Sequence, residues 1–124
     1  MTADASSRPH DGTDLATQWL VNLAPPLLVL LDLQLGYSLV DFSCATGDRV
    51  TTHLVHGGLL LVTLLLATVA HRSWRRAGPA WPDDAGDRDT RSRFLALLGL
   101  LVSLGSALVI ATQWLPVFLL SPCQ

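Results

Sequence analysis

The sequence contains no lysine and no glutamate, so all eight basic residues are arginine and all ten acidic residues are aspartate. Charged residues make up only 15% of the 124-residue chain, and the formal net charge is −2. A chain with so few charges and a slightly acidic balance lacks the basic surface that binds phosphates. We therefore expect no nucleic-acid partner.

Short motifs of catalysis are also missing from the sequence. It has no glycine-rich phosphate loop, no nucleophile elbow, no C-x-x-C pair and no C-x-x-C-H haem attachment. Its hydrophilic loops are too short to hold a catalytic domain, and its two cysteines are too few for a disulfide-rich scaffold. We expect a protein that is not an enzyme.

Long apolar stretches dominate what is present, since half of the residues are hydrophobic. A membrane-crossing helix needs about 20 mainly apolar residues, and three segments meet that requirement, at about 20–42, 50–71 and 94–115. The sequence thus predicts an all-α integral membrane protein whose three transmembrane helices form one domain over residues 19–124. Three spans are few for a transporter built from repeats.

Breaks in the hydrophobic pattern define the ends of these predicted spans. Residues 1–18 are mostly polar and acidic, which predicts a disordered tail. Pro25 and Pro26 fall in the first turns of the first span, where a missing N–H group is tolerated. Pro116 indicates the end of the third span.

The arginines predict the orientation of the spans. The loop 72–93 carries six of them, at positions 72, 75, 76, 88, 91 and 93, whereas the loop between the first two spans carries only Arg49. Cytoplasmic loops are enriched in basic residues. We therefore predict a cytoplasmic loop 72–93 and a cytoplasmic tail 1–18, with the N-terminus inside and the C-terminus outside.

This topology brings the two cysteines to the same side of the membrane. Cys44 follows the outer end of the first span and Cys123 follows the outer end of the third. Disulfides persist in oxidising, non-cytoplasmic compartments, so we predict a Cys44–Cys123 disulfide. Two free thiols, or soft ligands for Cu(I), are the alternatives.

Asp32 is the most unusual residue of the spans, because it lies near the middle of the first one. Intramembrane ionisable residues are costly and are functional candidates by default. By depth, we expect Asp32 to form a hydrogen bond between helices with Thr63, Ser103 or Ser106. A proton-relay role and a contact with a partner subunit are the alternatives.

Further polar residues are predicted to gather near the outer surface. His53 and His56 share one face of the second span, and Gln113 lies at similar depth on the third. Gln34, Tyr37 and Asp41 share one face of the first span. We expect these side chains to form an interhelical hydrogen-bond network. The alternative is a metal or haem site on His53 and His56, which needs a third ligand such as Asp41 or a cysteine.

Small residues indicate where the helices pack. Gly57 and Gly58 are adjacent on the second span, and Gly99, Ser103 and Ser106 form a stripe on the third. Small side chains let membrane helices approach closely. We interpret both groups as packing surfaces of the bundle, with homo-oligomer formation as the alternative.

Several short motifs carry a resemblance to a known group. They are Tyr37-Ser-Leu-Val-Asp-Phe-Ser-Cys44, the His53-x-x-His56 pair, the arginine-rich loop, Arg93-Phe-Leu-Ala-Leu-Leu-Gly, Gln113-Trp-Leu-Pro and the terminal Pro122-Cys123. From about Trp19 to Cys123 the chain resembles small, uncharacterised three-span membrane proteins of bacteria that tend to be encoded near haem-copper cytochrome c oxidase genes. Asp32 is not part of that pattern.

This resemblance implies a multi-pass protein of the bacterial inner membrane that contacts lipid and a partner complex. The leading hypothesis is a non-enzymatic accessory subunit or assembly factor, with a respiratory cytochrome c oxidase as its complex, and this role requires no cofactor. One alternative is a copper- or haem-handling protein that uses His53 and His56. Another is a small proton- or solute-conducting oligomer that uses Asp32.

Overall fold

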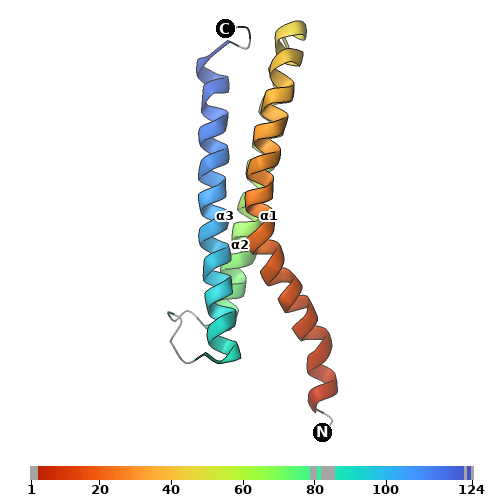
Figure 1. Ribbon diagram of the computed structural model, residues 1–124, viewed down its shortest axis with the longest axis vertical. Helices are drawn as coiled ribbons and strands as arrows, with labels where there is room; N and C mark the ends of the chain where they lie inside the picture. The colour runs from red at the N-terminus through yellow and green to blue at the C-terminus, as the bar shows by residue number, and fades with distance from the viewer. Residues whose placement is uncertain (1–2, 79–80, 82–85, 122, 124) are drawn as a thin grey trace.

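Three helices account for nearly all of the computed structural model, which describes residues 3–78, 81, 86–121 and 123, with side chains from Leu15 onward. The helices are α1 (Ala3–Thr46), α2 (Val50–Ala77) and α3 (Arg88–Leu119). Each is long and apolar enough to cross a membrane, which confirms the predicted all-α, three-span architecture. Figure 1 shows each helix running antiparallel to the next, so the chain termini lie at opposite ends of the bundle.

The two ends of the bundle differ in chemistry. The α1–α2 loop, Cys44 and Cys123 share one end, named here the cysteine end. The α2–α3 connection and its flanking arginines lie at the other, named here the arginine end. Parts of the predicted tail and loop, at 1–2, 79–80 and 82–85, lie outside the described residues.

The first helix is longer than the predicted span. It begins at Ala3, so most of the segment predicted to be a disordered tail is helical, and its membrane-spanning portion begins at Leu15. Pro25 and Pro26 therefore lie well inside α1 rather than in its first turn. Proline removes a backbone hydrogen bond and bends a helix. Figure 1 shows α1 (red to orange) turning away from the other helices toward its N-terminus.

The third helix is also longer than predicted, because it continues past Pro116 to Leu119. Proline bends or weakens a helix without always ending it when the remaining backbone groups find partners. Here the carbonyl oxygen of Pro116 accepts a hydrogen bond of 2.8 Å from the N–H of Leu120, the residue at which α3 ends.

α1 and α3 are in close contact at Gly99, in the half of the bundle nearer the arginine end. A Cβ atom added to Gly99 would lie 2.7 Å from a methyl carbon of Val21, so only glycine allows this contact. Beside it, the Asn22 side chain donates to the carbonyl oxygens of Gln18 and Leu95, at 2.6 Å and 3.1 Å. These contacts fix the crossing point of α1 and α3.

Small and β-branched side chains form the core around this crossing. Val21, Pro25, Asp32, Thr63, Ser103 and Ile110 are the largest fully buried side chains. Most leucines face outward, as expected when the surrounding solvent is hydrocarbon. The predicted packing surface on α3 is thus buried, since Ser106 and Ala107 join Gly99 and Ser103 among its buried residues.

Only one of the two glycines predicted to form a packing surface on α2 faces another helix. A Cβ atom at Gly57 would lie 3.5 Å from the ring of Trp114 on α3, so this glycine faces the neighbouring helix. Gly58 does not, because a Cβ atom there would meet nothing within 4 Å. Each residue turns a helix by about 100°, which carries Gly58 out of the interface.

Two aspartates stabilise the starts of α2 and α3 in the same way. Asp48 accepts hydrogen bonds from the Thr51 hydroxyl and the Val50 N–H, at 2.7 Å and 2.9 Å. These bonds hold the pKa of the Asp48 carboxyl below its ordinary value. The Thr90 hydroxyl has the same effect on the pKa of Asp87. Both carboxylates therefore keep a negative charge beside a helix N-terminus, where it is favourable.

The close crossing predicts which glycine of α3 resists substitution. Changing Gly99 to Ala places a methyl group against Val21, and overpacking of this kind lowers the unfolding free energy by about 1–3 kcal/mol. Changing Gly105 to Ala is the matched control, since its added Cβ meets nothing within 4 Å. Unfolding of the purified variants in mixed micelles, followed by circular dichroism, measures both. Equal stability of the two variants would contradict the crossing described here.

Candidate functional site

A buried aspartate–histidine pair joins α1 to α2. The Nδ1 atom of His56 lies 2.6 Å from Oδ1 of Asp32, and both side chains are almost completely buried, at 5% and 0% exposed. The two side chains share one hydrogen bond, and the histidine tautomer determines which atom donates. Because both groups are buried away from water, this hydrogen bond is electrostatically stronger than one at the surface.

Gly36 makes room for this contact. It lies one turn from Asp32 on the same face of α1, and a Cβ atom there would be only 3.5 Å from Cε1 of His56. The imidazole ring therefore lies along α1 between Gly36 and Asp32. A larger residue at position 36 would press on the ring and displace it from the carboxylate.

The partners predicted for Asp32 are wrong. Its carboxylate makes no hydrogen bond to the hydroxyls of Thr63, Ser103 or Ser106. The Thr63 hydroxyl donates to the carbonyl oxygen of Leu59 in its own helix, and that of Ser103 donates to Val21 at 3.4 Å. The expected partners lie at the same depth along the helix axis as Asp32. A histidine side chain extends several ångströms from the backbone, so His56 reaches Asp32 from a different depth.

A cavity of about 420 Å³ opens beside the pair, between α1 and α3. Its walls come from all three helices: Asp32, Leu33, Gly36, Tyr37 and Val40 of α1, Thr52 and His56 of α2, and Gln113, Pro116 and Val117 of α3. Two buried acceptor atoms in these walls, Oδ2 of Asp32 and Oε1 of Gln113, have no hydrogen-bond partner. Unpartnered buried oxygens are unusual, since most buried polar atoms are hydrogen-bonded.

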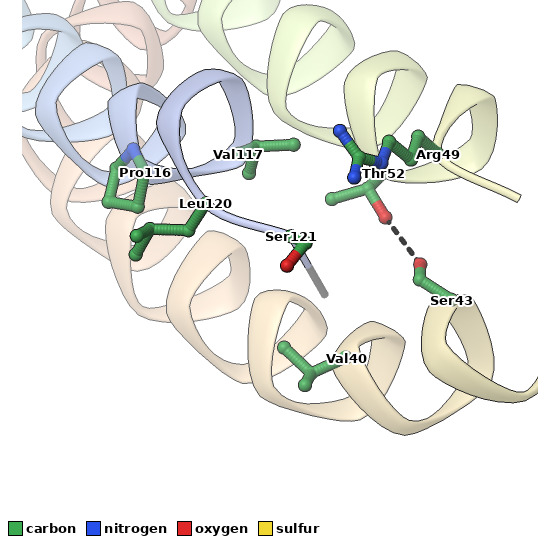
Figure 2. Close-up of a pocket in the computed structure, with 8 residues that line it drawn as sticks. All are labelled: Val40, Ser43, Arg49, Thr52, Pro116, Val117, Leu120 and Ser121. Carbon is green, nitrogen blue, oxygen red and sulfur yellow. Dashed lines mark hydrogen bonds between the residues drawn. The ribbon is translucent and has the colours of Figure 1, made fainter. Parts of the chain in front are cut away.

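A second cavity of about 210 Å³ adjoins the first at the cysteine end. Four residues line both cavities, namely Val40, Thr52, Pro116 and Val117. Figure 2 shows Val40 of α1 facing α3 across this space and the Ser43–Thr52 hydrogen bond, 2.9 Å long, at its edge. We name the two cavities together the polar groove, because an acid–base pair lies at its deep end and Arg49, Leu120 and Ser121 at its shallow end.

The two histidines of the H-x-x-H motif have different neighbours. His53 accepts a hydrogen bond of 3.0 Å from the indole N–H of Trp114 on α3 and packs against the ring of Phe118. His56 instead binds Asp32 on α1. Within the described part of the chain, no three side chains of histidine, cysteine, aspartate or glutamate converge as a metal ion requires. The two histidines therefore connect α2 to both neighbouring helices, to α3 through His53 and to α1 through His56.

The predicted polar network is divided into separate groups by the structure. Gln113 lines the polar groove and Tyr37 lies at its rim, 72% exposed. Gln34 and Asp41 are exposed on the outer surface of α1. They lie about 180–200° around the helix from Asp32 and so cannot join the network inside the bundle.

The two cysteines are adjacent at the cysteine end, as their predicted topology requires. Their Cα atoms lie 5.2 Å apart and their sulfur atoms are within bonding distance. That Cα separation falls inside the range of disulfides. The bond closes a loop with a sequence separation of 79 residues and ties the segment after α3 to the end of α1.

Asn22, Gly36 and Thr52 are site or packing residues that sequence reasoning missed. A spacing of four and seven residues gives a signal in principle, since it places Asp32, Gly36 and Ser43 on the same side of α1. That signal becomes specific only when the face that meets the other helices is known. In an apolar helix surrounded by lipid, composition alone does not reveal that face.

Comparisons with protein-family models, with curated proteins and with solved structures find no match to this chain. The function is therefore argued from the geometry of the described residues.

The acid–base pair predicts energetic coupling between two helices. Replacing either Asp32 or His56 with Ala leaves a buried polar group without its partner, which costs about 1–3 kcal/mol of unfolding free energy. The double variant should lose less than the sum of the two single losses, because the contact is removed only once. Reversible unfolding in mixed micelles measures the unfolding free energy of the unchanged chain, the two single variants and the double variant. Strictly additive losses would show that the two side chains do not interact.

The cysteine geometry predicts that neither thiol is free. A thiol-reactive polyethylene glycol maleimide should add no mass to the denatured, unreduced chain and should add two labels after reduction. The Cys44→Ser and Cys123→Ser variants should each take one label without reduction. Reduction should also lower the unfolding free energy by about 2–4 kcal/mol, as is typical of loop-closing disulfides. Labelling of the unreduced native-sequence chain would contradict the bond.

Proposed function

We propose that this chain is a non-enzymatic accessory subunit or assembly factor of a larger membrane complex. One observation carries the proposal: a row of polar side chains on the membrane-spanning part of α1 faces away from the bundle. Gln34 and Asp41 form this row, which we name the polar stripe, and both are exposed.

Hydrocarbon does not satisfy the polar stripe. The Gln34 side chain carries two N–H donors and a carbonyl acceptor, and its side chain has no hydrogen bond to any described residue. The neighbouring Ser38 hydroxyl turns inward to the helix and donates to the Gln34 carbonyl oxygen at 3.0 Å. Amide and carboxyl groups in membrane spans form hydrogen bonds between helices. A transmembrane helix of a partner protein with matching polar groups is therefore the proposed occupant.

The cysteine end is built to present the polar stripe in a fixed orientation. Ser43 and Thr52 hold α1 to α2, and Trp114 and His53 hold α2 to α3. The cysteine pair joins the end of α1 to the segment after α3. These cross-links limit rotation of α1 about its own axis, which reduces the ordering cost of binding a partner.

The larger complex is proposed to be a respiratory cytochrome c oxidase of a bacterial inner membrane. The support for this identity is the resemblance carried by the cysteine, histidine and Gln113-Trp-Leu-Pro motifs. The positive-inside pattern supports an orientation with the arginine end in the cytoplasm. The polar stripe would then lie in the outer half of the bilayer.

The two alternative functions gain less support from the geometry. Copper or haem handling through His53 and His56 requires their ring nitrogens to converge, but the two rings bind different helices. Conduction by an oligomer that uses Asp32 requires this residue to face a path between copies. Asp32 is instead fully buried within one bundle, where it contacts His56.

Site-specific photo-crosslinking tests the proposal in cells that encode the chain. A benzoylphenylalanine residue at Gln34 or Asp41 should crosslink a membrane subunit of the oxidase. The same residue at Leu61 of α2 or Leu108 of α3, which are 59% and 67% exposed, should crosslink it at least several-fold less. Equal yields from all four positions, or crosslinks only between copies of this chain, would contradict the accessory role.

The identity of the complex is tested separately by a reduced-minus-oxidised visible spectrum of the chain purified in mild detergent. The sample is not crosslinked. Haem bands that disappear when the subunit identified by crosslinking is dissociated from the chain support an oxidase as the partner. Crosslinks to a membrane protein without any haem bands would retain the accessory role and reject the oxidase.

A further inference from the structure

We propose that the polar groove is a binding site for an uncharged, membrane-soluble molecule that carries a hydroxyl donor, such as an alkyl phenol. The proposal concerns the space between α1 and α3 and is independent of the polar stripe on the opposite side of α1. It is supported by the unpartnered acceptors, by the shape and chemistry of the walls and by the depth of the groove inside the bundle.

The unpartnered acceptors determine which chemical group the groove recognises. Asp32 is fully buried, and one carboxylate oxygen is occupied by His56 while the other, Oδ2, is free. On the opposite wall, Oε1 of Gln113 is buried and also lacks a donor. Two acceptors that line one cavity, without a donor between them, require a ligand that donates hydrogen bonds.

The size and walls of the groove determine the rest of the ligand. An apolar cavity of about 150 Å³ is sufficient to hold benzene, and the deeper cavity measures about 420 Å³. Its other walls are apolar and come from Leu33, Val40, Pro116 and Val117. A mainly apolar cavity with a few convergent polar groups is typical of small-molecule sites. A phenyl ring with part of an alkyl chain matches this combination.

The depth of the groove inside the bundle also argues against a charged ligand. An additional charge at this depth of a membrane would be costly. A neutral hydroxyl supplies the missing donor without that cost.

The groove is open toward the side of the bundle, where a membrane-soluble molecule can enter. Tyr37 and Val40 are on its rim and are 72% and 50% exposed. The shallow cavity continues from the same rim toward Leu120 and Ser121 (Figure 2). The alkyl chain of a bound phenol would thus lie along apolar walls while its hydroxyl reaches Asp32 and Gln113.

The single tyrosine of the chain provides a direct test, because it lies on the rim of the groove. The full-length chain is produced with 3-fluorotyrosine and placed in lipid nanodiscs, so that Tyr37 gives one ¹⁹F resonance. This resonance is followed during titration with 4-octylphenol and with 4-octylanisole, whose methyl ether has the same shape but no donor. We expect a saturable shift with the phenol and an affinity at least about tenfold weaker for the ether.

Matched variants show whether the named acceptors are responsible. Gln113→Met removes one acceptor from a half-buried position and should reduce the preference for the phenol several-fold. Gln34→Met makes the same change on the outer surface of α1 and should leave that preference intact. Asp32→Asn removes the carboxylate and should weaken phenol binding further, and its folding is checked by circular dichroism. Gln113→Met keeps the test valid if Asp32→Asn does not fold.

Three outcomes would overturn the proposal. They are no saturable response of Tyr37 to the phenol, equal responses to the phenol and the ether, and an unchanged preference in Gln113→Met. Photo-crosslinking tests the polar stripe, which lies on the opposite side of α1 from the groove. Failure of the ligand proposal therefore does not contradict the accessory role, and failure of the accessory role does not contradict the ligand proposal.

Discussion

The hydrocarbon of a membrane offers no hydrogen-bond partner, and this constraint explains where the polar groups of the three helices lie. Backbone groups are satisfied within each helix, whereas side chains need partners in their own helix, on neighbouring helices or near the surfaces. Asp32 forms a hydrogen bond with His56, Ser43 forms one with Thr52, and the indole N–H of Trp114 donates one to His53. Each contact joins two helices, so the same constraint that makes these residues costly makes them the specific connections of the bundle.

α1 and α3 are in close contact at one level and leave a cavity between them toward the cysteine end, and this shape follows from the sizes of a few side chains. At Gly99 the backbone of α3 meets Val21 directly. Toward the cysteine end, Trp114 and Phe118 occupy the space beside His53, between α2 and α3. The small size of Gly99 lets α1 and α3 pack together at one level. At the level of the two aromatic residues, α3 packs against α2 instead. The polar groove is the space that remains between them.

Much of the architecture was predictable because hydrophobic length is a strong signal. The three spans, and the meeting of Cys44 with Cys123, follow from the apolar stretches and from alternating direction. Helix ends were less predictable, since residues that often end helices, such as Pro25, Pro26 and Pro116, lie inside helices that continue past them.

The site was only partly predictable, because its contacts depend on rotation about each helix axis. Asp32 and His56 were separately identified as candidates, but their pairing depends on the small size of Gly36 and on the length of an imidazole side chain. Gln34 and Gln113 are the same residue type at similar depth, yet one faces outward and the other lines a cavity. In helices that are leucine-rich all round, the sequence contains no periodic stripe that would separate the two cases.

The position of the cysteines has a consequence for the order of assembly. Cys44 follows the first span, but Cys123 reaches it only after the third span has crossed the membrane and returned the chain to the same side. Once joined, the residues between them form a covalent ring that contains α2, the arginine-end connection and α3. The bond thus records that insertion is complete, and a cut in the backbone between α2 and α3 would leave both pieces attached.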